Sequence, residues 1–224
     1  MTRFATLTTA HLTDACLRLG HAVRCAPVRA VHPGDRLEGR ALPVRHAGSV
    51  DVYLEAFERA EPGDVLVVDN AAREDEACLG DLVVLEARGA GLSGVLAWGL
   101  HRDTADITAI GLPVFSLGAF PSGPRRLDEV PSGPAVIAGH AVTSDDVVLA
   151  DEDGALFVPG AALDELFTAA ETIRDTERRQ AELIRAGTSL RAQVRFTDYL
   201  AARRADPALT FRDHLRGVGG AIEV

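Results

Sequence analysis

Three ionisable residues in the middle of the chain have the types and the spacing of a site that handles a small anion. Asp81 follows Gly80, and twenty residues after Asp81 comes the pair Arg102-Asp103. An arginine presents a planar fork of N–H donors that fits a carboxylate, and an aspartate supplies the hard oxygen that Mg²⁺ or Mn²⁺ prefers. We therefore expect Arg102 to bind a substrate carboxylate, Asp103 to hold a divalent metal, and Asp81 to act with Arg102 in catalysis.

Asp81 is also expected to lie in the first turn of a helix, which gives its neighbours a role. The first backbone N–H groups of a helix have no partners within it and lie at the positive end of its dipole, so they attract anions. Gly80, Leu82 and Val83 would then bind the same substrate. The residues alone leave an alternative open, because an aspartate is common at a helix start and an exposed Arg-Asp pair can be merely solvated.

Two further motifs match known ligand sites less well. The segment from Gly89 to Gly94 has the glycine spacing of a dinucleotide site, but such a site joins a strand to a following helix. Here the glycines are expected to close a helix and to precede a strand. Asp153-Gly154, beside Asp151 and Glu152, lacks the ligand spacing of a calcium loop and is typical of a solvated hairpin turn.

The elements expected around the central motif form a strand–helix–strand unit. The pattern predicts a buried strand from Val65 to Val68, a helix from Cys78 to Arg88, a second strand from Gly94 to Trp98 and a loop from Gly99 to Ala105. In such a unit, ligands gather at the carboxyl ends of the strands and at nearby helix N-termini. The unit would therefore bring the start of its helix together with the loop that carries Arg102-Asp103.

Outside this unit, the sequence predicts an α/β core followed by a helical extension. We expect helices at Thr8 to Gly20 and Val50 to Arg59, irregular chain with short strand-like pieces from Ala30 to His46, strands at Leu112 to Phe115 and Ala135 to Ile137, and a hairpin from Asp145 to Val158. From Ala161 to about Ala186 the pattern is helical, whereas the tail from Arg191 shows no clear core face. Residues 1–160 would form the core with the site, and residues 161–224 a C-terminal helix and tail for oligomer contacts.

Composition and charge exclude several classes of protein. The 224 residues are 47% hydrophobic and 5% aromatic, which suits one aliphatic globular core. The formal net charge of −10 repels a phosphate backbone and argues against nucleic acid as a partner. The three cysteines have neither disulfide-framework nor zinc-site spacing, and no segment resembles a signal peptide or a membrane span. We expect a cytoplasmic protein that does not bind membranes.

Most of the chain resembles the 4-hydroxy-4-methyl-2-oxoglutarate aldolase family, which also includes the regulator of ribonuclease activity A. The resemblance rests on Asp81, the twenty-residue spacing and Arg102-Asp103, together with residues 14–20, 62–70, 80–103, 111–115 and 145–159. Only the tail after about Ile184 falls outside it. Regulatory members of the family generally lack the acidic residue at the first motif position, so Asp81 favours an enzyme.

The resemblance implies a fold, an assembly and a chemistry. The fold would be a three-layer αββα sandwich, assembled as a homotrimer or homohexamer, with an acidic metal ligand from the neighbouring chain's C-terminal region. The protein would be a Mg²⁺- or Mn²⁺-dependent lyase, an aldolase or decarboxylase that acts on small 2-oxo acids through a pyruvate enolate. Arg102 would stabilise that enolate, and Asp81 would orient a water that moves the proton. A Schiff-base route is excluded because the sequence contains no lysine.

Two residues depart from the family pattern, and a second function remains open. Trp98 stands where the family usually has aspartate, and we interpret it as a core residue rather than a substrate wall. His101 stands where a small aliphatic residue is common, and beside Arg102 it could serve as an additional acid or base. The alternative to a lyase is a non-catalytic adaptor that binds a protein partner such as a ribonuclease. The physiological substrate, and the balance of cleavage against decarboxylation, do not follow from the residues.

Overall fold

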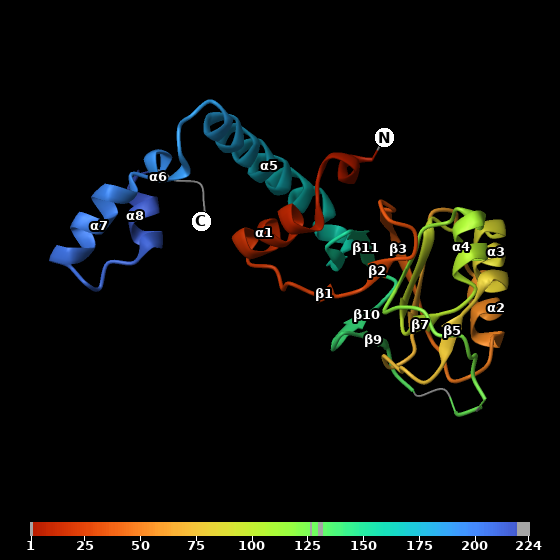
Figure 1. Ribbon diagram of the computed structural model, residues 1–224. Helices are drawn as coiled ribbons and strands as arrows, with labels where there is room; N and C mark the ends of the chain where they lie inside the picture. Colours follow the sequence, from red (N-terminus) through yellow and green to blue (C-terminus); the bar gives the residue numbers. More distant parts are fainter. Residues whose placement is uncertain (1, 126, 130–131, 219–224) are drawn as a thin grey trace.

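The computed structural model describes residues 2–125, 127–129 and 132–218. An eight-stranded sheet curls through the middle of the protein (Figure 1). The strand order is β1-β12-β11-β3-β4-β6-β8-β2, and two short two-stranded sheets, β10-β9 and β5-β7, flank it. The strands are β1 (Cys25–Ala26), β2 (Arg29–Ala30), β3 (Leu37–Arg45), β4 (Val65–Asp69), β5 (Ala77–Leu79), β6 (Gly94–Trp98), β7 (Leu100–His101), β8 (Val114–Ser116), β9 (Ala135–Ile137), β10 (His140–Val142), β11 (Asp146–Asp151) and β12 (Gly154–Pro159).

The helices lie in two groups on opposite sides of this sheet, followed by a helical extension (Figure 1). They are η1 (Arg3–Thr6), α1 (Thr9–Leu19), α2 (Asp51–Phe57), α3 (Asp81–Gly89), α4 (Thr104–Ile110), η2 (Gly160–Ala162), α5 (Leu163–Arg185), α6 (Leu190–Gln193), α7 (Phe196–Ala205) and α8 (Phe211–Val218). Within the described ranges, no helix combines the length and the apolar character needed to cross a membrane.

Alternating side chains along the strands explain how the sheet packs on both faces. In β4, Val65 and Val67 face the inside of the curl, while Leu66 and Val68 face helices α2, α3 and α4. Successive side chains of a strand point to opposite faces, so a fully apolar strand needs a cover on each side. Strand β12 alternates in the same way between the inside of the curl and helices α1 and α5. The layers are therefore helices, sheet, sheet and helices, which confirms the expected αββα order, with four layers rather than three because the one sheet curls onto itself.

The region from Ala30 to His46 differs from the expectation of irregular chain, because most of it forms the nine-residue strand β3. This strand changes partner halfway: residues 37–40 pair antiparallel with β11, and residues 41–45 pair parallel with β4. Pro43 lies past the last residue that pairs with β11, where a missing N–H costs least. Gly39 is required by close packing, since a Cβ atom there would lie 2.2 Å from the carbonyl oxygen of Gly63.

The predicted strand–helix–strand unit is present, but its helix begins three residues later than expected. Ala77–Leu79 form β5, which pairs in parallel with β7, and helix α3 starts at Asp81. The residues before Gly80 are apolar and buried, and a short apolar run looks the same in a strand and in a buried helix. The loop predicted from Gly99 likewise contains β7 and the start of α4.

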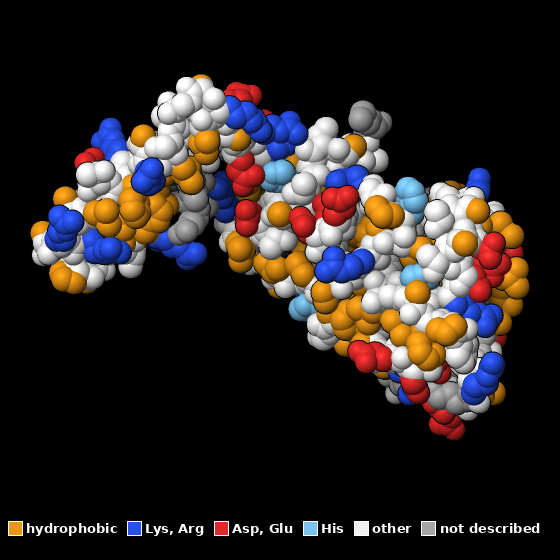
Figure 2. Space-filling model, viewed as in Figure 1, with side chains coloured by type: hydrophobic (Ala, Val, Ile, Leu, Met, Phe, Trp, Pro, Cys, Tyr) orange, Lys and Arg blue, Asp and Glu red, His pale blue; other side chains and the backbone are white. Residues whose placement is uncertain are grey.

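The tail has a small core of its own, which corrects the expectation that it lacks one. We call residues 190–218 the C-terminal arm; α5 carries it away from the sandwich (Figure 1). Tyr199 and Leu215 are buried there, and the rings of Phe196 and Phe211 lie 5.7 and 5.0 Å from the Tyr199 ring. Figure 2 shows hydrophobic side chains gathered among basic ones on the surface of this arm. The apolar residues are spread over short helices, so no single helical stripe marks them in the sequence.

Candidate functional site

Asp81 and Arg102 of the central motif line one pocket at the N-terminal end of α3, whereas Asp103 lies beside it and is not a lining residue. The pocket has a volume of about 280 Å³, and its walls include Gly80, Asp81, Leu82, Val83 and Arg102. The expected helix start and the following loop therefore lie side by side. Parallel pairing of β5 with β7 explains this, because Leu79 is registered with His101 and each strand leads directly into one half of the motif.

Gly80 lies against the Arg102-Asp103 pair, which leaves no room for a side chain at position 80. A Cβ atom at position 80 would lie 2.8 Å from Asp103 Oδ2 and 3.3 Å from Arg102 Nε. Arg102 Nε itself lies 3.2 Å from Asp103 Oδ2, and the Arg102 backbone N–H donates a 2.9 Å hydrogen bond to the Leu79 carbonyl. The side chains of Arg102 and Asp103 remain 47% and 35% exposed, so both can still meet a ligand.

Asp103 has an unusual backbone for an aspartate at the start of a helix. It occupies the N-cap position of α4 with φ 61° and ψ 40°, in the left-handed region, and its side chain accepts no capping hydrogen bond. An N-cap aspartate ordinarily has an extended backbone and accepts a hydrogen bond from its own helix. The left-handed conformation costs about 1 kcal/mol for a residue with a Cβ atom. Here that conformation accompanies a carboxylate that lies beside Gly80 instead of capping α4.

Asp81 is the first residue of α3, after Gly80 as an extended N-cap. The Val84 N–H donates to the Gly80 carbonyl, which is the first turn of intrahelical bonding, so the amides of Leu82 and Val83 have no partner within the helix. Leu82 and Val83 line the pocket together with Asp81. The arrangement places anion-attracting N–H groups and a possible proton carrier in the same wall.

The donor set suits a hard divalent cation rather than a soft one. The described ranges contain no group of three or more His, Cys, Asp or Glu side chains arranged to hold a metal. Mg²⁺, however, is commonly bound through one or two carboxylates and keeps several waters. The Asp103 carboxylate, next to the space left by Gly80, fits that pattern, and Asp81, the residue after Gly80, lines the pocket.

His101 is buried and does not line the pocket. Its Nδ1 lies 2.7 Å from Ser116 Oγ and its Nε2 lies 3.0 Å from Thr104 Oγ1. Burial lowers the pKa of this imidazole below its ordinary value. Because both ring nitrogens are engaged by hydroxyl groups, the geometry argues against the acid or base role that the sequence suggested.

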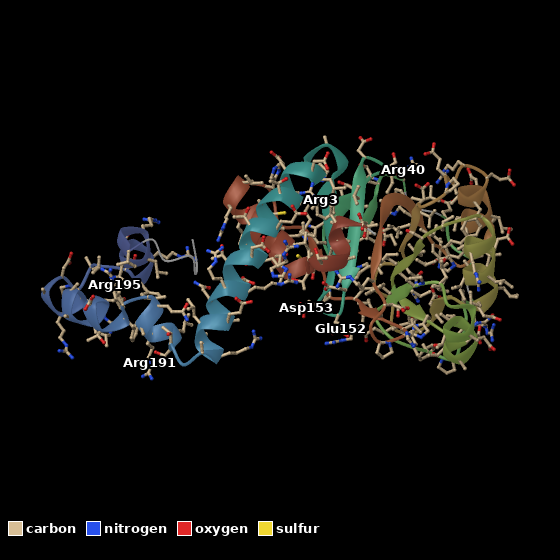
Figure 3. All side chains as sticks on the ribbon, turned by 90° about the horizontal axis from the view of Figure 1, so that it is seen from above. Arg3, Arg40, Glu152, Asp153, Arg191 and Arg195 are labelled. Carbon is tan, nitrogen blue, oxygen red and sulfur yellow. The ribbon has the colours of Figure 1, made fainter. Side chains whose placement is uncertain are left out.

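Trp98 lies at the end of β6 and packs against the core inside the curl of the sheet. The side chain is only partly buried there, so the interpretation of Trp98 as a core residue stays a prediction. The glycine segment that follows α3 also has the predicted order, since Gly89 ends that helix and Gly94 begins β6. Glu152 and Asp153 are exposed in the turn between β11 and β12, as expected for a solvated hairpin (Figure 3).

His46 is a pocket residue that sequence reasoning missed. It follows β3, is buried, and its Nδ1 lies 2.9 Å from Asn70 Oδ1. Its ring stacks on Tyr53 at 5.3 Å, and the Tyr53 hydroxyl donates to the Cys78 carbonyl. Burial also raises the pKa of the Cys78 thiol to about 12, so this wall carries no thiolate. A single histidine after a strand has no distinctive spacing, and only the fold brings it to the pocket.

Comparison with known proteins connects this geometry to a family. The family model described as RraA-like, Aldolase/RraA, matches residues 9–157. A Halalkalibacterium halodurans protein named "Putative 4-hydroxy-4-methyl-2-oxoglutarate aldolase" is 26% identical over 198 residues, 87% of this chain and 93% of that protein. Protein DlpA of Legionella pneumophila is 31% identical over 128 residues, 56% of this chain, but the match spans only 21% of DlpA.

Solved structures show the same fold. A crystal structure of an uncharacterized protein from Pseudomonas syringae has a TM-score of 0.74 and 27% identity, covering 84% of this chain and 92% of its own. Streptomyces coelicolor RraAS2, described as an unusual member of the RNase ES inhibitor RraA protein family, has a TM-score of 0.69 and 25% identity, with coverages of 79% and 92%. The range matched by the family model contains all the pocket residues described above.

Proposed function

This chain belongs to the RraA-like family, Aldolase/RraA, and we propose that it is a divalent-metal-dependent carbon–carbon lyase that acts on small 2-oxo acids. The proposed reactions are retro-aldol cleavage of 4-hydroxy-2-oxo acids and decarboxylation of oxaloacetate, which share a pyruvate enolate. One observation carries the proposal: the Arg102 guanidinium and the Asp103 carboxylate lie together against Gly80, beside the helix N-terminus that Asp81 begins.

Substrate binding would use the two kinds of N–H donor in the pocket. The Arg102 guanidinium can donate two hydrogen bonds to one carboxylate, and the backbone amides of Leu82 and Val83 offer further donors at the positive end of α3. A 2-oxo acid presents a carboxylate next to a carbonyl, so both groups of donors can bind one ligand. This arrangement fixes the orientation of the bond that is to be broken.

Charge development during bond cleavage would be met by Arg102. When the carbon–carbon bond breaks, its electron pair moves into the former keto group and produces an enolate, and a fixed cation at that position lowers the barrier. Asp103 would hold Mg²⁺ or Mn²⁺, which when bound supplies Lewis-acid polarisation of the keto oxygen. The Asp81 carboxylate would orient a water that moves a proton between the substrate hydroxyl or the enolate carbon and solvent.

We further propose that the protein is cytoplasmic and works as a homotrimer or homohexamer. The cysteines Cys16, Cys25 and Cys78 are free thiols, which suits a reducing compartment. The described residues of one chain offer no cluster of three or more metal ligands, so a neighbouring chain would complete the site, and the C-terminal helix and tail after residue 160 would make contacts between chains. The expected partner is a small 2-oxo acid, not nucleic acid or membrane.

The second candidate is a non-catalytic regulator that binds a protein such as a ribonuclease. The observation that favours it is the likeness to the Streptomyces coelicolor member of the RNase ES inhibitor family at 25% identity. Asp81 separates the two candidates, because a regulator has no need for a carboxylate beside an anion-binding helix N-terminus.

The experiment that tests the lyase proposal measures pyruvate release by the purified full chain. Oxaloacetate and branched 4-hydroxy-2-oxo acids would be supplied with Mg²⁺ or Mn²⁺, then with a chelator, and then with metal restored. We expect release from at least one acid, loss with chelator and recovery with metal, because the motif offers hard oxygen ligands. Turnover that resists the chelator would remove the metal from the proposal, and no turnover on any acid would favour the regulator.

A further inference from the structure

The Arg102-Asp103 pair is a two-residue arc that is fixed at both ends. On one side, His101 lies in β7, where its N–H donates to the Gly118 carbonyl and its carbonyl accepts from the Phe120 N–H. On the other side, Thr104 is the first residue of α4. The conformation of the arc is therefore coupled to the positions of His101 in β7 and Thr104 at the start of α4.

The His101 side chain spans the same two elements and reaches a third. Nδ1 contacts Ser116 at the end of β8, and Nε2 contacts Thr104, at 2.7 and 3.0 Å. A hydroxyl group can donate or accept a hydrogen bond, so a neutral imidazole, with one N–H and one lone pair, is satisfied at both nitrogens. Two such bonds on a buried ring fix its position, because an unsatisfied buried nitrogen is unfavourable.

We propose that His101 is a positioning residue whose ring ties Ser116 and Thr104 together and thereby holds the arc between β7 and α4, with the Asp103 carboxylate beside Gly80. Without this constraint, residue 103 has a lower-energy choice: an extended backbone in which its carboxylate caps α4. The clamp, defined here as the His101, Ser116 and Thr104 side chains, disfavours that choice. Its catalytic consequence rests on the proposed lyase function, but the conformational claim does not.

Thr104 is the best position at which to test the clamp, because it is exposed and the loss of its hydroxyl group should not unfold the protein. Thr104→Ala removes the hydroxyl that meets His101, and Thr104→Ser restores it. Thr108→Ala is the matched control: Thr108 lies one turn later on α4, is exposed, and its hydroxyl donates to the Thr104 carbonyl rather than to the clamp.

The first readout is hydrogen exchange in full-length protein, followed by mass spectrometry of peptides that cover residues 100–107. Loss of one hydrogen bond should speed exchange in this segment about threefold to tenfold in Thr104→Ala. Thr104→Ser and Thr108→Ala should match the wild-type protein. Unchanged exchange in Thr104→Ala would overturn the proposal, since the arc would then be held without the clamp.

The second readout is Mn²⁺ binding in the absence of substrate, measured by electron paramagnetic resonance. The half-saturating Mn²⁺ concentration should rise about threefold to tenfold in Thr104→Ala and return with Thr104→Ser. At saturating Mn²⁺, kcat should recover to about the wild-type value, which a general loss of structure would not allow. Faster exchange with unchanged Mn²⁺ binding would overturn the positioning of Asp103. If wild-type protein neither binds Mn²⁺ nor releases pyruvate, the lyase proposal fails, and the exchange comparison alone decides whether the clamp holds the arc.

Discussion

At the scale of single residues, the proposed site depends on the lack of a side chain at Gly80 and on the left-handed backbone of Asp103. Gly80 leaves the space that the Asp103 carboxylate and the Arg102 guanidinium occupy, and Asp103 takes a left-handed conformation that keeps its carboxylate from capping α4. Strained residues persist where the surrounding structure enforces them, and they concentrate at functional sites. Each feature can be tested with a single substitution.

Gly80→Ala should reduce pyruvate release strongly while changing the melting temperature little. The new Cβ would lie 2.8 Å from Asp103 Oδ2, so the carboxylate would have to move, whereas the extended backbone at position 80 accepts alanine. Gly89→Ala, at the other end of α3, is the control, because a Cβ there meets nothing within 4 Å. Equal activity in the two variants would show that the contact at Gly80 is irrelevant to turnover.

Arg102→Lys should be nearly as damaging as Arg102→Ala. Lysine keeps the positive charge but loses the planar fork, so the substrate carboxylate and the developing enolate would be misplaced. Removal of such a donor typically costs kcat about 100- to 1000-fold. Steady-state pyruvate release measures both variants, and a lysine variant with near wild-type kcat would mean that charge alone suffices.

The sequence predicts part of this site and not the rest, for physical reasons. Asp81, Arg102 and Asp103 are recognisable because their types and separation resemble a family motif and suit a helix start and a loop at neighbouring strand ends. His46 and the partners of His101 are not, because each is brought to its place by strand pairing between distant segments. A histidine in a loop is usually exposed to solvent. His101 is instead buried among β7, β8 and α4, and only the fold shows this.

At the scale of elements, the strands that form continuous apolar runs were predictable, and those that change surroundings were not. Residues 65–68 and 94–97 are buried apolar runs, covered on both faces, so their sequences indicate a buried strand. Strand β3 passes from β11 to β4 halfway, and Gly39 and Pro43 mark that transition. In isolation these two residues indicate breaks, and only the partner strands make them compatible with a strand.

The contact between Arg24 and Asp146 joins the chain just before β1 to the first residue of β11, and it predicts a loss of stability in acid. Burial would raise the pKa of the Asp146 carboxyl, but hydrogen bonds from Arg24 and Thr143 outweigh it and hold the pKa below its ordinary value of 3.8. The carboxylate therefore stabilises the fold above that ordinary value, and the stabilisation is lost as the pH falls toward the lower folded-state pKa.

The check is chemical denaturation of wild-type and Asp146→Asn protein between about pH 6 and pH 2. The unfolding free energy of the wild-type protein should fall more steeply with decreasing pH below about 4 than that of the variant, which has no carboxylate to protonate at this position. Parallel curves for the two proteins would show that this ion pair does not contribute to the pH dependence.

At the scale of the whole molecule, the C-terminal arm is basic and the rest of the chain is acidic. The arm has six arginines and three acidic residues between positions 190 and 218, although the whole chain has a formal net charge of −10. Figure 3 shows Arg191 and Arg195 on the arm, well apart from Glu152 and Asp153 on the sandwich. A basic arm that extends from an acidic body is suited to contact a second copy of the chain, in keeping with the proposed oligomer.

Light scattering of the full chain should therefore give a mass three or six times the 23.7 kDa of one chain. Leu215→Ala should lower that mass, because Leu215 is fully buried in the arm and its truncation removes about 2–5 kcal/mol of packing from a small core. A fully active monomer would contradict the assembly, and an unchanged mass in Leu215→Ala would show that the packing of the arm is not needed for it.

The most direct test of the central claim compares pyruvate release and thermal melting in wild-type and Asp103→Asn protein over a series of Mn²⁺ concentrations. Asparagine keeps the size of the side chain and tolerates the left-handed backbone at position 103, but it removes the anionic ligand. The lyase account predicts an unchanged melting transition together with loss of pyruvate release at every Mn²⁺ concentration. Near-normal turnover at low Mn²⁺, or a loss of activity that appears only with loss of the melting transition, would contradict it.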